Sequence, residues 1–173
     1  MPTISYRRIS AHMLTDLLER QDEDATHEYF NQDRGMFPYT LHHQALDEYW
    51  PLLRDFLEIN HNPHHIFWPL IHGARPLIAR YPPSSEQEYL TVIDYMSPRE
   101  VQAISQAMAR ITPEESIKRY MRWRKIEDET AVWEEDPRDY TGYRFVYELF
   151  CDVFCLFHIA EEAGDGMLRQ YGG

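Results

Sequence analysis

The first part of the chain alternates apolar and polar residues briefly and then changes to helical spacing. In PTISYRRI, Ile4 and Tyr6 alternate with polar residues, which predicts a strand with one buried face. Ser10 is a favourable N-cap for the segment that follows. The apolar residues of that segment recur at helical spacing, at Met13, Leu14, Leu17 and Leu18. Residues 22–39 carry few aliphatic side chains and include a glycine and a proline, so we expect a loop there.

The middle of the chain predicts one regular helix, a broken apolar segment and a second strand. In ALDEYWPLLRDFLEI the apolar residues share one face of a helix that begins near Asp47, and Pro51 is compatible only with its first turn. The apolar residues 65–83 are interrupted by prolines and by Gly73, which indicates short helices with a bend. The β-branched and aromatic residues of EYLTVIDYM then predict a strand.

The second half of the chain carries the clearest helix signals. SPRE at residues 97–100 and TPEE at residues 112–115 each combine a hydroxyl N-cap, a proline and a glutamate, which predicts two consecutive helices. An acidic and irregular stretch leads from them to a long helix over residues 143–163, which Gly164 caps. GMLRQY then predicts a closing strand. No repeat or domain boundary interrupts this order, so we expect residues 1–173 to form a single compact domain.

The composition fits a folded domain in the cytoplasm. The chain of 173 residues is long enough for one sizeable core, and its 43% hydrophobic residues exclude a disordered chain. The first residues lack the apolar region of a signal peptide, and no apolar run is long enough to cross a membrane. Cys151 and Cys155 lie on the expected last helix, where a disulfide staples nothing, so we expect both thiols to be reduced.

The net charge narrows the class of partner. With 29 acidic against 17 basic side chains the formal charge is −12, which repels nucleic-acid phosphates and anionic lipid surfaces. We therefore expect neither a nucleic acid nor a membrane as partner. A surface of this sign attracts a basic protein instead, at an association rate that falls with salt. The alternative is that the charge serves solubility alone.

Four of the nine histidines fall within INHNPHHIFWPLIHG, which raises the question of a metal site. His61 and His65 have the spacing at which two histidines on a helix share a metal ion. Pro63 lies between them and disfavours a continuous helix. A turn before the start of a helix, with imidazoles at the surface, is the favoured interpretation, and a metal site is the alternative.

A second cluster of candidate ligands lies on the expected last helix. Cys151, Cys155, His158 and Glu162 share the face opposite its apolar stripe. They spread along about 16 Å of a straight helix, so they cannot all reach one metal ion. A cysteine in the middle of a helix also lacks the cation or helix N-terminus that lowers the pKa of a catalytic thiol. We favour a helix buried on two sides. A metal-dependent or cysteine-dependent enzyme that uses this cluster or the histidine pair is the alternative.

An acidic and aromatic stretch is the strongest candidate for a binding surface. IEDETAVWEEDPRDYTGY places aromatic rings among carboxylates, a combination that suits hot spots facing a basic partner. The expected partner-binding residues are Glu127, Asp128, Glu129, Trp133, Glu134, Glu135, Asp136, Asp139 and Tyr140. The alternative is a solvated loop whose Trp133 folds back onto the core. Reversing the charges of Glu134, Glu135 and Asp136 is expected to slow association and to leave the thermal midpoint nearly unchanged.

The order of the segments is itself informative. It is carried by TISYRRISAHMLTDLLE, LDEYWPLLRDFL, PLIHG, SPREVQAISQAMARITPEE and AEEAGDGMLRQY, and it resembles the YfbM-like family of domains of unknown function. The family's strand-to-helix junction is matched at Tyr95, Ser97, Pro98 and Val101, and its ending only approximately at Ala160, Ala163 and Gly164. Arg54 stands where the resemblance leads us to expect histidine. The resemblance implies a mostly helical α+β domain with a small sheet of short strands, and it supplies no catalytic residue.

The sequence also lacks the signatures of common enzyme classes: the GxSxG elbow, the P-loop, GxGxxG, HExxH and CxxC. We therefore expect a non-enzymatic cytoplasmic binding protein without a metal or cofactor. An immunity-type inhibitor that masks a basic toxin or enzyme domain fits this description. A third hypothesis is a structural or oligomerising subunit in which apolar residues 66–78 form the contact patch.

Overall fold

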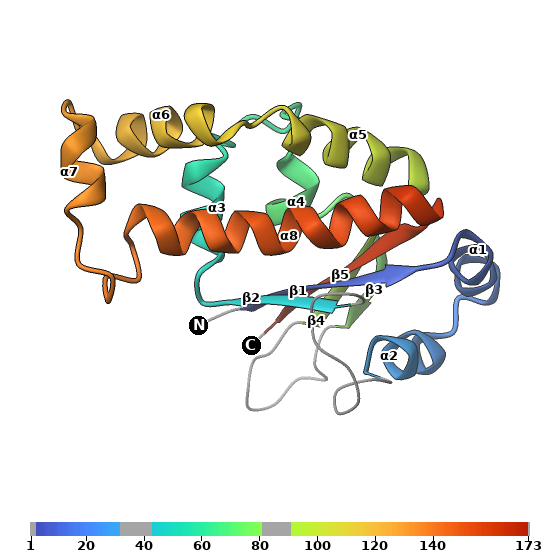
Figure 1. Ribbon diagram of the computed structural model, residues 1–173. Helices are drawn as coiled ribbons and strands as arrows, with labels where there is room; N and C mark the ends of the chain where they lie inside the picture. Colours follow the sequence, from blue (N-terminus) through green and yellow to red (C-terminus); the bar gives the residue numbers. More distant parts are fainter. Residues whose placement is uncertain (1–2, 32–42, 81–90, 173) are drawn as a thin grey trace, which may run out of the picture.

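One antiparallel sheet and a layer of helices build the part of the chain that the computed structural model describes, residues 3–31, 43–80 and 91–172 (Figure 1). The strands are β1 (Thr3–Ile9), β2 (His43–Asp47), β3 (Arg75–Arg80), β4 (Thr91–Met96) and β5 (Gly166–Gly172). The helices are α1 (Ala11–Arg20), α2 (Glu23–Asn31), α3 (Trp50–Phe56), α4 (Trp68–His72), α5 (Pro98–Ala109), α6 (Pro113–Arg124), α7 (Glu129–Trp133) and α8 (Tyr143–Ala163). The expected class, α+β and mostly helical, is confirmed.

The sheet has the strand order β2-β1-β5-β4-β3, so the last strand in sequence is its central strand. All neighbouring strands are antiparallel. The register places Arg169 of β5 opposite Tyr6 of β1 on one side and opposite Asp94 of β4 on the other. Because side chains alternate between the faces of a sheet, these three residues point to the same face.

The main core lies between this face of the sheet and α8. The long helix crosses the sheet, with α5 beside it and α3 in contact with both α6 and α8 (Figure 1). Tyr6 and Phe157 meet edge to face in this core at 5.9 Å between ring centroids. Phe56 of α3 packs on Phe150 of α8 at 5.6 Å. Burial of these large rings is the main favourable contribution to the stability of the fold.

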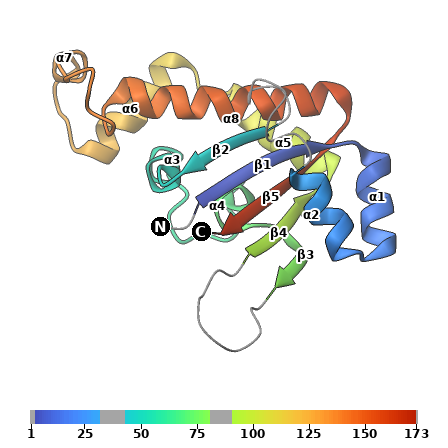
Figure 2. The same ribbon diagram turned by 90° about the horizontal axis from the view of Figure 1, so that it is seen from below.

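A smaller core covers part of the opposite face of the sheet. Leu14 and Leu17 of α1 pack there against Ile9, Ile93 and Leu168 of three neighbouring strands. Figure 2 shows α1 and α2 on this side of the sheet, near one end of the strands. Both faces of β1, β5 and β4 are therefore buried in part, and β1 is not the strand with one buried face that its alternation predicts.

The strongest local signals of the sequence form the predicted elements. Ser10 accepts a hydrogen bond from the backbone N–H of Met13 and begins α1. Ser97 and Glu100 form a complete capping box at the start of α5, and the Thr112 hydroxyl caps α6. The predicted strands β4 and β5 are present, and α8 spans the predicted residues and ends at Gly164, whose φ is 70°. For α1, α5 and α6 a short-range hydrogen bond fixes the start of the helix, and for α8 a glycine fixes its end.

The predicted loop over residues 22–39 is wrong in its first part, where α2 forms. Asp22 accepts a hydrogen bond from the backbone N–H of Ala25 at 3.0 Å and thus caps this helix. Thr26 is buried, and Ala25 and Tyr29 pack against the smaller core. The Asp22 cap and the helical spacing of Ala25 and Tyr29 are present in the sequence. The acidic residues around them led instead to the prediction of a loop. The remainder of the predicted loop, residues 32–39, lies outside the described residues.

Two strands replace parts of predicted helical segments. Residues His43–Asp47 pair with β1 as β2, so α3 begins at Trp50 and not near Asp47, with Pro51 in its first turn as expected. The broken apolar segment contains one short helix, α4, and then turns into β3 at Gly73. Pairing with a neighbouring strand decides both cases, and such pairing depends on tertiary structure. The segment before the last helix also contains a short helix, α7, which the sequence reading missed.

Candidate functional site

The acidic and aromatic stretch forms the end of the molecule beyond the sheet. It connects α6 to α8 through α7 (Figure 1). Among the described residues, three large hydrophobic side chains are exposed, and two of them, Trp133 and Tyr140, belong to this stretch. We call the surface formed by residues 127–140 the acidic-aromatic surface. Exposed aromatic rings of this size are typical of contact sites for other proteins.

The two exposed rings are held in place by contacts along one side. Trp133 is 50% exposed and lies edge to face against Tyr143 at 5.6 Å. Tyr140 is 64% exposed and lies against Tyr49 and Phe145, with ring centroids 6.2 Å and 5.4 Å away. Trp133 thus contacts the core residue Tyr143 on one side, as the alternative expects, and leaves the other half of its surface exposed. Rings that are already positioned lose little conformational entropy on binding.

Glu135 is part of the fold and not a free member of this surface. Its Oε1 accepts a hydrogen bond from the Tyr120 hydroxyl at 2.6 Å, and its Oε2 accepts one from the backbone N–H of Tyr143 at 2.7 Å. Gly142, the residue before α8, has no side chain to cap the helix, so Glu135 supplies the cap from outside. Burial and the Glu135 carboxylate together raise the pKa of Tyr120. The prediction that reversing Glu135 would leave the thermal midpoint unchanged does not fit this geometry.

Three further carboxylates of the surface are engaged in local hydrogen bonds. Asp128 caps α7 by accepting from Thr130 N–H, and Asp136 binds the Arg138 side chain. Asp139 accepts from both the backbone and the hydroxyl of Thr141. These donors hold the pKa of each of the three carboxyls below its ordinary value. The three side chains are thus charged but oriented by their own turns.

The remaining carboxylates are exposed and unengaged. Glu127, Glu129 and Glu134 make no hydrogen bond or ion pair with any residue that the structure describes. Glu134 lies next to Trp133 in sequence. The nine predicted residues therefore comprise two exposed rings, three carboxylates without a hydrogen bond to the described residues, and four carboxylates that make hydrogen bonds within the fold.

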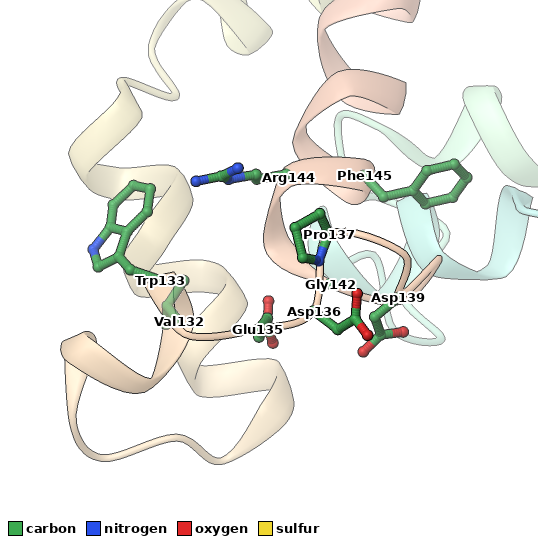
Figure 3. Close-up of a pocket in the computed structure, with 9 residues that line it drawn as sticks. All are labelled: Val132, Trp133, Glu135, Asp136, Pro137, Asp139, Gly142, Arg144 and Phe145. Atoms are coloured by element: carbon green, nitrogen blue, oxygen red, sulfur yellow. The ribbon is translucent and has the colours of Figure 1, made fainter.

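Figure 3 shows the hollow behind this surface, which is lined by Trp133, Arg144, Phe145 and the backbone turn before α8. Its volume is about 20 Å³. A space of this size holds about one water molecule. The surface offers no small-molecule pocket here, and its open rings and carboxylates suit a macromolecule.

The histidine-rich stretch forms a turn, which is the interpretation that Pro63 favours. It runs from the end of α3 to the start of α4, with His61 and His64 exposed. The Nδ1 atom of His65 accepts a hydrogen bond from the backbone N–H of Phe67 at 3.2 Å. His72 stacks on Trp68 at 3.8 Å. Partial burial and the Arg119 charge lower the pKa of His65, which keeps this imidazole neutral at pH 7.

The cysteine cluster on α8 is spread over surfaces of different exposure. Cys151 is half-buried, Cys155 is exposed, and both are free thiols. Burial raises the pKa of Cys151 above its ordinary value, which is the reverse of what a nucleophilic thiol needs. His158 is about half exposed and lies beside Glu161 and Glu162 on the same helix.

Neither cluster assembles a metal-binding geometry. Among the residues with a described placement, no three His, Cys, Asp or Glu side chains come together as metal ligands. The contact patch suggested for residues 66–78 is mostly inaccessible to a partner. Ile66 is exposed, but Phe67, Leu70 and Ile71 are buried in the core. None of the helices in the described ranges has the length and apolar character needed to cross a bilayer.

The sequence reading missed a buried ion pair. Asp94 of β4 and Arg169 of β5 lie opposite each other, and Arg169 donates a hydrogen bond to Asp94 Oδ2 at 2.6 Å. Their side chains are 9% and 4% exposed. The available signal was a charged residue at an inward position in both TVIDYM and GMLRQY, since charges are rarely buried without a partner.

The family of this chain follows from its sequence as a whole. The profile of the family described as a domain of unknown function (DUF1877) matches residues 1–169. The chain belongs to this family, as the order of its segments predicts.

A solved structure of similar fold supports this assignment. The chain is similar to the crystal structure of YfbM, a protein of unknown function from Escherichia coli, with a TM-score of 0.60 and 11% sequence identity. The match covers 98% of this chain and 99% of that one. No curated protein matches the sequence. The likeness thus concerns the architecture of the whole domain.

Proposed function

We propose that this protein is a non-enzymatic cytoplasmic binding protein that docks a basic protein on its acidic-aromatic surface. The observation that carries the proposal is the exposure of Trp133 and Tyr140, two of the three exposed large hydrophobic side chains among the described residues. The partner class that fits best is a basic toxin or enzyme domain, which an immunity-type inhibitor masks. No metal or cofactor takes part.

Charge complementarity supports a basic occupant. Glu127, Glu129 and Glu134 are exposed carboxylates of the same segment as the rings, and the whole chain carries a formal charge of −12. Such a surface accelerates the approach of a basic protein and disfavours an acidic one. The carboxylates used by the fold, above all Glu135, fix the backbone that presents the rings.

The alternative enzyme has less support. A cysteine-dependent reaction needs a thiolate at neutral pH, whereas burial raises the pKa of Cys151. A metal-dependent reaction needs converging ligands, and the described part of the chain holds no group of three. Stoichiometric zinc in the purified protein, with loss of this zinc on replacement of His61 or Cys155, is the result that would favour that alternative.

The decisive experiment compares two matched charge reversals. The site variant is Glu127→Lys with Glu134→Lys, and the control is Glu19→Lys with Glu28→Lys on α1 and α2. All four side chains are exposed and make no hydrogen bond with the described residues, so each variant changes the net charge equally without loss of a contact. The partner is isolated from the native lysate by cross-linking to the wild-type protein, and association rates are measured at low and high salt.

The site variant is expected to slow association by about tenfold at low salt, and the control by much less. The difference should shrink at high salt because screening weakens exposed charges. Equal slowing in both variants would show that net charge alone controls the association rate. It would reject the acidic-aromatic surface as the docking site. The Trp133→Ala variant should speed dissociation, and an unchanged dissociation rate would reject the ring as an anchor.

A further inference from the structure

A polar pocket lies between the sheet and the two short helices α3 and α4, away from the acidic-aromatic surface. Figure 2 shows α4 partly behind β5 and α3 beside the end of β2. The floor of the pocket consists of two cross-strand pairs, Val92 opposite Tyr171 and Asp94 opposite Arg169. All four side chains share one face of the sheet, because each pair lies two residues from the other along its strand.

The helices supply the walls of the pocket. Trp50 comes from the first residue of α3, and Ile71 and His72 come from the end of α4. The volume is about 240 Å³, which is close to the small end of ligand pockets in proteins, about 300–1,000 Å³. Aromatic and aliphatic walls around a few polar groups are the usual composition of a site for a small organic molecule.

The ion pair on the floor leaves hydrogen-bonding capacity for a ligand. Arg169 donates to the carbonyl oxygens of Leu70 and Ile71 and to Asp94 Oδ2, so three of its five N–H groups are used. Asp94 receives that single hydrogen bond, and its Oδ1 accepts none from the residues in the described ranges. The Asp94 side chain is 9% exposed and lines the pocket, where its Oδ1 stays accessible, so the N–H of a ligand can reach this oxygen in place of water.

The position of the ion pair is fixed by the chain around it. Gly73 follows α4 with a φ of 80°, and a Cβ atom at this residue would collide with the Asp94 carboxylate. Tyr6 donates its hydroxyl hydrogen bond to the same Leu70 carbonyl that Arg169 binds, at 2.7 Å. The donor and the acceptor on the pocket floor are therefore held rigidly side by side.

Charge balance restricts the class of ligand. The floor pairs one carboxylate with one guanidinium, so a charged ligand would leave a net charge in a partly buried site. Partial burial and the nearby Arg169 and Arg54 lower the pKa of His72, which leaves this wall neutral at pH 7. A neutral molecule keeps the site balanced and can use both floor groups.

We propose that this pocket binds a small uncharged planar molecule with an amide-type edge, whose N–H donates to Asp94 Oδ1 and whose carbonyl accepts from Arg169. The flat ring of such a ligand, a lactam or carboxamide of nucleobase size, lies against the Trp50 and Tyr171 side chains. This site is independent of the docking of a basic protein.

Matched small probes test this assignment. Nicotinamide and uracil carry the amide edge without charge, nicotinate carries a negative charge on the ring of nicotinamide, and 3-picolylamine carries a positive one. Each probe is titrated into the full chain by ¹H–¹⁵N NMR. Saturable shifts at the amides of residues 92–94 and 169–171 are expected for the neutral probes, with a Kd on the order of 1 mM for molecules this small. The charged probes should bind at least tenfold more weakly.

A filled pocket provides the second measurement. Val92→Phe enlarges a half-buried floor residue without removal of a side-chain hydrogen bond, and it should weaken nicotinamide binding at least tenfold. Glu28→Gln on α2 is the remote control and should bind like wild type. The assignment is overturned by equal binding of charged and neutral probes, by the absence of saturable shifts, or by shifts that map outside the pocket. The map of NMR shifts on the wild-type protein tests the assignment even if Val92→Phe lowers the yield of folded protein.

Discussion

Two arginine–aspartate pairs in this protein have similar hydrogen-bond distances and very different surroundings. Arg138 binds Asp136 on the acidic-aromatic surface at 2.9 Å, with side chains 89% and 51% exposed. Arg169 binds Asp94 on the sheet at 2.6 Å, with side chains 4% and 9% exposed. Water screens the first pair and does not reach most of the second. Removal of one partner is therefore expected to have little effect at the surface turn and to be costly on the sheet, where it leaves a buried charge unpaired.

The same contrast holds for single carboxylates. Glu134 and Glu135 are neighbours, but Glu134 extends into solvent and Glu135 joins α6 to the start of α8. An acidic stretch is thus not one uniform surface. Its members are available to a partner only where the fold does not already use them.

The largest expected effect is the loss of the buried pair. Arg169→Met leaves Asp94 without its counter-charge and removes the donor to the Ile71 carbonyl, and it should cost about 3–5 kcal/mol of the free energy of unfolding. Arg138→Met is the matched control and should leave urea denaturation unchanged. Equal midpoints for the two variants would contradict the distinction drawn between the pairs.

Simultaneous replacement of both partners sharpens this test. Asp94→Leu with Arg169→Met removes both charges, so it should recover part of the stability that Arg169→Met loses. Recovery remains incomplete because the Ile71 carbonyl still lacks the donor that Arg169 provided. If the double variant is less stable than the single one, the unpaired charge is not the cause of the loss.

A smaller effect separates the two neighbouring glutamates. Glu135→Ala removes the acceptor for the Tyr120 hydroxyl and for the Tyr143 N–H, with an expected cost of about 1–3 kcal/mol in thermal or urea denaturation. Glu134→Ala should change stability by no more than about 0.5 kcal/mol, as exposed positions usually do. A Glu134→Ala variant that is less stable than Glu135→Ala would contradict the structural role of Glu135.

The smallest effect is a difference in acid titration. Burial raises the pKa of Asp94 despite Arg169, whereas hydrogen bonds lower the pKa of Asp139. In a carboxyl ¹³C NMR titration from neutral to low pH, Asp94 should therefore protonate first.

The two shifts have opposite signs for stability. The lowered pKa of Asp139 stabilises the fold above the unfolded-state pKa, and this contribution is lost as the pH falls through the folded-state pKa. The raised pKa of Asp94 means that its ionised form costs stability at higher pH, and protonation relieves that cost. An Asp94 resonance that titrates below that of Asp139 would show that Arg169 outweighs burial.

Local signals predicted the elements that are fixed by local contacts. The hydroxyl caps at Ser97 and Thr112 and the apolar spacing of α8 gave the right helices, since their determinants lie within a few residues. The strands β2 and β3 were not predicted, because only the hydrogen bonds to β1 and β4 distinguish them from helix starts. Pairing across the sheet is a tertiary property that one segment does not reveal.

The candidate sites follow the same rule. The composition of the stretch marked Trp133 and Tyr140 as candidate contact residues but left the exposure of Trp133 open, and the capping role of Glu135 depends on where α6 lies relative to α8. The Asp94–Arg169 pair joins residues 75 positions apart in sequence. Each charge lies at an inward position of its own strand, but only the register of β4 and β5 shows that the two residues lie opposite each other.

The position of β5 determines when the sheet can assemble. During synthesis β1 appears first, but its inner neighbour β5 appears last of the five strands, and Thr3 bonds to Gly172 across 169 positions. The ribosome therefore completes four strands before the strand that joins them exists. Pairing over such a distance closes a large loop, which slows folding and leaves the edges of β1 and β4 open to other chains in the interval. The facing edges of β1 and β4 therefore stay without their native partner until β5 is made.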